Sequence, residues 1–191
     1  MPPVAGMKLL AFAASLKRES LNRKLLNLAV ELARDSGVAV DLAEFREFDM
    51  PLYNADVQSS AGFPEGALEL DRRIQAGDGL MIASPEYNYS FPGTLKNAID
   101  WVSRMSPMPF RGKHGFLLAA SSTVAGGIRG LWALRVPLEG LGVTLYPDMF
   151  ALAQAAQALD ERGKLKDPGL QERLEKMVKG YLRMGAKLSS P

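Results

Sequence analysis

Hydrophobic and polar positions follow two patterns that alternate along the chain. Short apolar runs bounded by Gly or polar residues are typical of buried strands, and five such runs occur, at 8–14, 38–43, 79–83, 115–120 and 143–146. Between them, apolar residues spaced three and four apart predict amphipathic helices. The predicted helices cover 21–36, 64–76, 94 to about 104, 128 to about 141, and the stretch from 167 onward.

Strands that alternate with helices predict an α/β fold with a parallel sheet between two helical layers. For five strands we expect a flavodoxin-like three-layer sandwich whose five-stranded parallel sheet has the order 2-1-3-4-5. The length of 191 residues suits a single domain over residues 1–191. In this strand order, the loops after the first, third and fourth strands meet at one edge of the sheet, where ligands of such folds bind.

The amino-acid composition limits the chemistry that the side chains of this protein can perform. The chain has no Cys and one His, which excludes thiolate nucleophiles, iron–sulfur clusters and Cys- or His-rich metal sites, so we expect no metal. Redox chemistry would therefore need a bound organic cofactor. The net charge of only +2 gives no field that favours nucleic acid or a membrane surface as partner.

The start of the chain resembles a signal peptide, because residues 7–15 combine a basic residue, an apolar run and small residues. This apolar run is shorter than a typical signal sequence, and we interpret it as the first strand, preceded by a loose leader at 1–6. No stretch approaches the ~20 apolar residues of a membrane span. We expect a cytoplasmic protein.

The first loop, ASLKRESLN at 14–22, joins a strand to the start of a helix. Unpaired N–H groups at a helix N-terminus favour a phosphate, and Ser15, Ser20 and Asn22 add hydroxyl and amide donors beside Lys17 or Arg18. The spacing matches neither the dinucleotide-binding nor the Walker glycine pattern. An ordinary Ser20 cap with a solvated basic turn explains the loop equally well.

The loop after the third strand, SPEYNYSFP at 84–92, is longer and richer in chemistry than a plain strand-to-helix connection. Tyr87, Tyr89, Phe91 and Trp101 lie in one short span, which favours a planar ligand. Aromatic residues are nevertheless more often core than ligand contacts, so a surface turn with packed rings is the alternative.

The loop after the fourth strand has adjacent glycines, Gly126 and Gly127, which allow positive φ or a close backbone approach. A Gly-rich helix start capped by Ser is an equally good explanation. A serine hydrolase is disfavoured because no G-x-S-x-G motif occurs. The one histidine, His114, lies at a strand entrance, where a packing or solvated residue is expected rather than a base.

With these loops in view, the sequence resembles the NADPH-dependent FMN reductase family, a flavodoxin-like group that includes bacterial chromate and quinone reductases. The resemblance runs from about residue 7 to 150. Its most specific parts are PEYNYS at 85–90, PG at 92–93 and LKNAIDW at 95–101. The segment DMPLYN at 49–54 is similar to a D-x-P-x-Y/F segment near the family's active face.

The first loop is similar to the family's G-S-L-R-x-x-S-x-N phosphate loop, with two departures. Ala14 stands where the family has Gly. Lys17 replaces Arg, which keeps the charge and loses the planar two-pronged donor, and Arg18 can take over the phosphate.

The resemblance implies a role for each matching position. Ser15, Lys17, Ser20 and Asn22 would hold the FMN phosphate, with Arg18 and the N–H groups around Leu16 and Leu21. Backbone groups of Pro85, Glu86, Tyr87 and Asn88 would lie along the isoalloxazine ring. From the fourth-strand loop, the ring would be approached by Ser121, Ser122 and Gly126.

The implied activity is an FMN-dependent NAD(P)H oxidoreductase that reduces a small-molecule electron acceptor in ping-pong order, with no catalytic acid or base. The acceptor would be a quinone, or chromate, a ferric complex or an azo compound. NADPH or NADH would be the co-substrate, and a homodimer or homotetramer would complete the site. A flavodoxin-type electron carrier is the main alternative, although such carriers tend to be strongly acidic, and a flavin-binding sensor is a third possibility.

Overall fold

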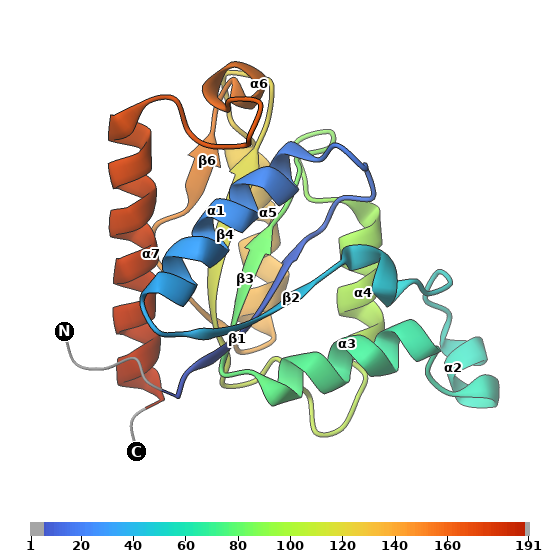
Figure 1. Ribbon diagram of the computed structural model, residues 1–191. Helices are drawn as coiled ribbons and strands as arrows, with labels where there is room; N and C mark the ends of the chain where they lie inside the picture. Colours follow the sequence, from blue (N-terminus) through green and yellow to red (C-terminus); the bar gives the residue numbers. More distant parts are fainter. Residues whose placement is uncertain (1–5, 190–191) are drawn as a thin grey trace.

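The strands pair in parallel in the predicted order. The computed structural model describes residues 6–189, so the expected leader at 1–6 falls almost wholly outside them. The sheet has the order β2-β1-β3-β4-β5, with β6 also paired to β4 (Figure 1). Its strands are β1 (Lys8–Ala13), β2 (Ala39–Ala43), β3 (Gly79–Ala83), β4 (His114–Ala120), β5 (Thr144–Leu145) and β6 (Phe150–Leu152).

Helices cover both faces of the sheet, which makes the three predicted layers (Figure 1). One face is covered by α1 (Leu21–Asp35) and α7 (Pro168–Leu188), and the other by α3 (Glu65–Ala76), α4 (Gly93–Val102) and α5 (Ile128–Gly140). Shorter helices lie in the connections: η1 (Phe45–Phe48), α2 (Ala55–Ala61) and α6 (Ala155–Ala158). Within residues 6–189, no helix has the length and apolarity that a membrane crossing requires.

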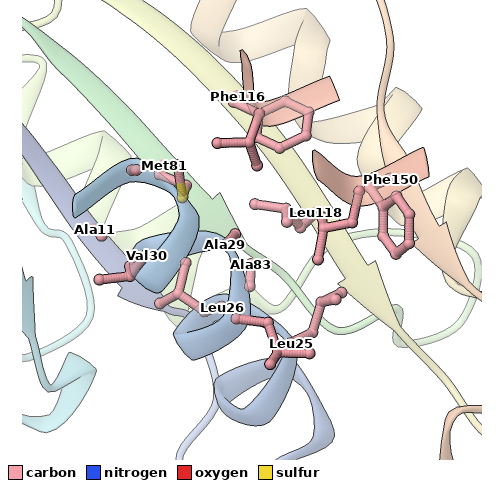
Figure 2. Close-up of a cluster of buried hydrophobic side chains, with 14 of the residues drawn as sticks. Ala11, Leu25, Leu26, Ala29, Val30, Met81, Ala83, Phe116, Leu118 and Phe150 are labelled. Atoms are coloured by element: carbon pink, nitrogen blue, oxygen red, sulfur yellow. The ribbon is translucent and has the colours of Figure 1, made fainter. Parts of the chain in front are cut away.

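The side chains of the central strands alternate between two hydrophobic cores, as a strand period of two requires. Leu9, Ala11 and Ala13 of β1 pack with α1 and α7, whereas Leu10 and Phe12 pack with α3, α4 and α5. Figure 2 shows the first core, in which side chains from α1 meet those of β1, β3 and β4. Every residue of β3 and β4 is buried, so the carboxyl ends of these strands are held rigidly.

The sequence pattern does not predict helix α2 or strand β6. Helix α2 lies between the predicted strand at 38–43 and the predicted helix at 64–76, and none of its residues is buried, so it has no hydrophobic face that the sequence pattern could show. The fifth strand continues after a break, because β5 and β6 both pair with β4, at His114 and Gly115 and then at Leu118 to Ala120. The break lies at Tyr146–Met149, around Pro147.

His114 is a packing residue, at the edge of the sheet opposite the carboxyl ends. It is 2% exposed, and its Nδ1 lies 3.0 Å from the hydroxyl of Tyr181, which donates to the Leu80 carbonyl at 3.0 Å. Because that hydroxyl has one hydrogen, we assign the imidazole hydrogen to Nδ1. Nε2 is then a bare nitrogen, buried without a hydrogen-bond partner among residues 6–189.

This burial makes the folded protein resist protonation of His114. Burial is the main cause that lowers the pKa of His114 from 6.5 to about 4; Asp78 opposes the shift, and Lys113 adds to it. The unfolded chain binds a proton below about pH 6.5, whereas the folded chain does so only near pH 4. The stability gained from a neutral His114 is therefore present above pH 6.5 and is lost as the pH falls from 6.5 towards 4.

We expect acidification from pH 7 to pH 5 to lower the free energy of unfolding by about 2 kcal/mol through this residue. His114→Gln removes the titrating group and keeps an amide that can hydrogen-bond Tyr181. Urea unfolding of both proteins at the two pH values measures the effect. The variant should lose less stability than the parent on acidification, and an equal loss in both would contradict the assignment.

Candidate functional site

The carboxyl ends of β1, β3 and β4 border one cavity of about 250 Å³, into which the three predicted loops converge. The register explains the convergence, because Ala13 pairs with Ala83 and Ala83 pairs with Leu118, so the strands end close to one level. The cavity is lined by Ser15, Lys17, Glu19, Ser20, Leu21, Asn22, Pro85, Glu86, Tyr87, Ala120, Ser121 and Ser122.

Most residues predicted for the site line this cavity, and four do not. Leu16 and Arg18 are exposed residues of the first loop, and Asn88 lies exposed at the tip of its turn. Gly126 is buried, and a Cβ there would lie 2.9 Å from the Ala153 nitrogen, so this glycine packs against the segment that follows β6. Glu19 and Ala120 line the cavity although the sequence did not single them out.

The N-terminus of α1 opens into the cavity. Ser20 caps the helix, and its Oγ accepts the Arg23 N–H at 3.3 Å. Ser15, which is also buried, accepts the Lys17 N–H at 3.4 Å. Because both serine oxygens accept from the backbone, their hydroxyl hydrogens stay available to a ligand. The first turn of α1 has no acidic residue to compete for its positive end.

The Asn22 side chain links α1 to β4. Its Nδ2 donates to the Ala120 carbonyl at 3.0 Å, and its Oδ1 accepts the Ala120 N–H at 2.9 Å. Asn22 is 4% exposed, so the pair of bonds is shielded from water. The amide therefore occupies the last backbone position of β4 as a neighbouring strand would. This geometry gives Asn22 a positioning role, and the phosphate contact that the family resemblance implies stays a prediction.

The loop after β3 folds into a tight turn beside the cavity. Tyr87 and Ser90 exchange backbone hydrogen bonds of 2.8 and 3.0 Å, and the two residues between them have positive φ, 49° at Asn88 and 68° at Tyr89. Two positive-φ residues between paired neighbours define a type I′ turn. Pro85 is buried at the base of this turn, whereas the rings of Tyr87 and Tyr89 are exposed.

Two other aromatic residues of the same stretch belong to the core. Trp101 is fully buried, and Phe91 packs against the core between the sheet and α3, α4 and α5. The Trp101 Nε1 donates to the Pro51 carbonyl at 2.8 Å. Asn97 bonds the same segment twice, donating to the Pro51 carbonyl at 2.9 Å and accepting the Tyr53 N–H at 2.8 Å. Residues 97–101 (NAIDW) therefore hold the segment at 49–54 in place.

A second cavity, of about 300 Å³, lies on the other side of the first loop. Its floor contains Phe45 and Phe48, and Arg46 at its edge donates to the Leu16 carbonyl. The lining consists of Leu16, Phe45, Arg46, Phe48, Asp49, Met50, Thr94 and Asn97. The first loop thus borders both cavities, this one at Leu16 and the other at Ser15 and Lys17.

The donor set of the first cavity fits the phosphate and ribityl parts of a flavin mononucleotide. A long helix N-terminus, two serine hydroxyls and the Lys17 ammonium converge where a dianion could bind. Ser121 and Ser122 add further hydroxyls from the β4 loop. Among residues 6–189, no group of three or more His, Asp or Glu side chains could hold a metal ion.

Comparisons with known proteins agree with this chemistry. A family model described as NADPH-dependent FMN reductase matches residues 7–157. An NAD(P)H-dependent FMN reductase of Pseudomonas aeruginosa is 37% identical over 173 residues, which cover 90% of this chain and 91% of the relative. A quinone reductase of Escherichia coli is 49% identical over 87 residues, 46% of each chain.

Solved structures have the same architecture. The flavoenzyme NAD(P)H:(acceptor) oxidoreductase FerB from Paracoccus denitrificans superposes with a TM-score of 0.80 at 28% identity, over 95% of this chain and 98% of that one. Flavodoxin 1 from Bacillus cereus, at 9% identity and a TM-score of 0.60, has the same fold. The fold, the cavity and the match over residues 7–157 agree, and the chain belongs to the NADPH-dependent FMN reductase family.

Proposed function

We propose that the protein is an FMN-dependent NAD(P)H oxidoreductase that reduces quinones or similar small acceptors. The observation that carries this proposal is the convergence of the α1 N-terminus, the type I′ turn and the β4 loop on one cavity. The names of the relatives support it, because an FMN reductase and a quinone reductase are both among them. Bound FMN would accept hydride from the nicotinamide and pass electrons to the acceptor.

The first loop would bind and orient the phosphate end of the cofactor. Ser15 and Ser20 can donate their hydroxyl hydrogens, and Lys17 adds a positive charge at the rim. Arg18, one residue further on, is exposed and does not line the cavity. We assign the main charge contact to Lys17.

The turn at 87–90 would provide a backbone surface for the flavin ring. The N–H groups of Asn88 and Tyr89 lie at its tip and take no part in the two bonds that close the turn. Preorganised N–H donors beside the ring would stabilise negative charge on the reduced cofactor, which requires no side chain to act as acid or base. Ser121 and Ser122 would complete the polar surroundings from the β4 loop.

The second cavity offers a place from which a flat acceptor or nicotinamide can approach. Its apolar floor suits an aromatic ring, and the Arg46 guanidinium and Thr94 hydroxyl at its edge suit polar substituents. Chromate, ferric complexes and azo compounds stay predictions as further acceptors. A cytoplasmic location and a homodimer or homotetramer stay predictions as well.

The proposal predicts that purified protein takes up FMN and oxidises NADPH or NADH when a quinone is added. Flavin absorbance after gel filtration measures uptake, and the fall in nicotinamide absorbance measures turnover. A protein that binds FMN but needs a separate reductase for turnover would be a flavodoxin-type carrier or a sensor. Failure to take up FMN at all would refute the proposal.

Two substitutions separate ligand binding from scaffolding in the first loop. Ser20→Ala should raise the Kd for FMN about tenfold, since one hydrogen bond to a charged group is lost, with a loss of stability of about 1 kcal/mol from the cap. Asn22→Ala should cost more stability, about 2 to 4 kcal/mol, because the buried N–H and carbonyl of Ala120 lose their partners. Fluorescence titration and urea unfolding measure the two quantities.

Ser36→Ala is the matched control, since it removes a hydroxyl from the opposite end of α1, where Ser36 donates to the Leu32 carbonyl. Its Kd for FMN should equal that of the parent. Unchanged FMN affinity in Ser20→Ala would place the phosphate elsewhere. Unchanged stability in Asn22→Ala would remove the positioning role of that side chain.

A further inference from the structure

The turn at 87–90 has a backbone conformation that its sequence does not favour. Type I′ turns prefer Asn or Asp followed by Gly, and here Asn88 is followed by Tyr89 at a φ of 68°. A bulky residue in the left-handed region costs about 1 kcal/mol or more, so its surroundings must hold it there. Tyr89 is also 70% exposed, so burial of its ring in the core does not provide that hold.

Arg129, in the first turn of α5, contacts this loop in two ways. Its guanidinium carbon lies 4.2 Å from the centroid of the Tyr89 ring, a cation–π contact. Its Nη2 lies 2.6 Å from Oε1 of Glu86, the residue that precedes the turn. Its Nε is buried and has no hydrogen-bond partner within residues 6–189. The ion pair with Glu86 and the ring contact with Tyr89 therefore help to place this side chain.

The backbone of α5 approaches the same loop closely. The Gly130 N–H donates to the second oxygen of Glu86 at 3.0 Å. A Cβ at Gly130 would lie 3.1 Å from the Cβ of Glu86 and 3.2 Å from the Ser90 carbonyl oxygen, so a side chain would push the loop away. Both oxygens of Glu86 are therefore bound by the first turn of α5, and both ends of the turn are covered by it.

The ion pair between Arg129 and Glu86 also neutralises a negative charge beside the cavity. The Glu86 side chain is 8% exposed and lines the cavity in which we place the cofactor. Burial raises the pKa of Glu86, but the Gly130 N–H and Arg129 together outweigh burial and hold the pKa below its usual value. Glu86 is therefore ionised, and Arg129 cancels its charge. An unpaired carboxylate here would repel the phosphate and the negative charge that reduction adds.

We propose that Arg129 is a positioning residue for the flavin ring, which fixes the turn at 87–90 through Tyr89 and neutralises Glu86 beside the cofactor. The proposal rests on the FMN-binding function proposed above. It assigns a role to a residue outside the three loops, on a helix that the cavity lining does not include. Arg129 sets the shape of the ring surface and the charge beside it, without contact with the reacting atoms.

The first test needs no cofactor. In apoprotein, Arg129→Met removes the charge and keeps a side chain of similar length, and we expect the amide hydrogens of Tyr87 and Ser90 to exchange with solvent at least about tenfold faster. These two N–H groups close the turn, so their exchange reports its opening. Exchange equal to that of the parent would overturn the positioning role, whether or not the protein binds FMN.

The second test measures charge. In FMN-loaded protein, Arg129→Met should weaken binding of reduced FMN about tenfold more than that of oxidised FMN, a shift of the midpoint potential by about 30 mV to more negative values. Glu86→Gln removes the charge and keeps an oxygen for the Gly130 N–H. In the Glu86→Gln background, Arg129→Met should therefore shift the potential much less. A shift of equal size in both backgrounds would overturn the action through Glu86.

Arg72→Met is the matched control, because Arg72 forms an exposed ion pair with Glu69 on α3, with 2.7 Å between the charged atoms. It should leave both the amide exchange rates and the midpoint potential unchanged.

If Arg129→Met does not fold, Glu86→Gln alone decides, since loss of a buried negative charge should shift the midpoint potential to more positive values. An unchanged potential in Glu86→Gln would overturn the charge role. Failure of the parent protein to bind FMN would count against the proposed function, and the exchange experiment would still decide the positioning role.

Discussion

Parallel pairing of β1, β3 and β4 is the constraint on which the site depends. The three strands are almost entirely buried and end near one level, because Ala13, Ala83 and Leu118 stand opposite one another. The loops that follow have to leave from the same edge. Their positions are fixed because a shift of one residue would move every side chain of a strand into the opposite core. Three segments separated by about 70 and 35 residues become neighbours for this reason.

Residues 85–101 contain the most specific part of the family resemblance, and they serve two purposes: some line the first cavity and others hold neighbouring backbone in place. Pro85, Glu86 and Tyr87 line the cavity, whereas Asn97 and Trp101 bind the backbone at Pro51 and Tyr53. A short sequence therefore shapes the cavity at the α1 N-terminus with its first residues and holds the border of the second cavity with its last. Motif residues that look like ligand contacts in a family comparison can instead keep neighbouring backbone in place.

Much of the architecture could be predicted because the spacing of apolar residues along the chain shows which side chains are buried. The central strands and long helices have clear apolar patterns, and the strand order follows from their alternation. Helix α2 has no buried residue, and β6 is three residues long, so neither leaves a pattern to detect. The cluster of aromatic residues at 87–101 led us to predict a planar ligand, which stays a prediction, because Trp101 and Phe91 belong to the core.

For the candidate site, the sequence predicts that three loops meet at one edge of the sheet, but it does not predict the contacts between them. The sheet order places the three loops together, whereas the bond between Asn22 and Ala120 spans 98 positions and that between Gly130 and Glu86 spans 44. No local pattern encodes such pairs. Arg129 lies in the first turn of a helix that begins after two glycines, where a basic residue is usually solvated, so only the folded chain reveals its partners.

The bond between Asn22 and Ala120 has a mechanical consequence. A side-chain amide has the same donor and acceptor as a peptide group, so α1 is joined to the end of β4 by two short, directional bonds. Packed apolar contacts tolerate sliding, but paired hydrogen bonds of opposite direction resist both sliding and rotation. The width of the cavity between α1 and β4 is thus set by the covalent dimensions of one side chain. Thermal motion that would change this width has to break both bonds at once.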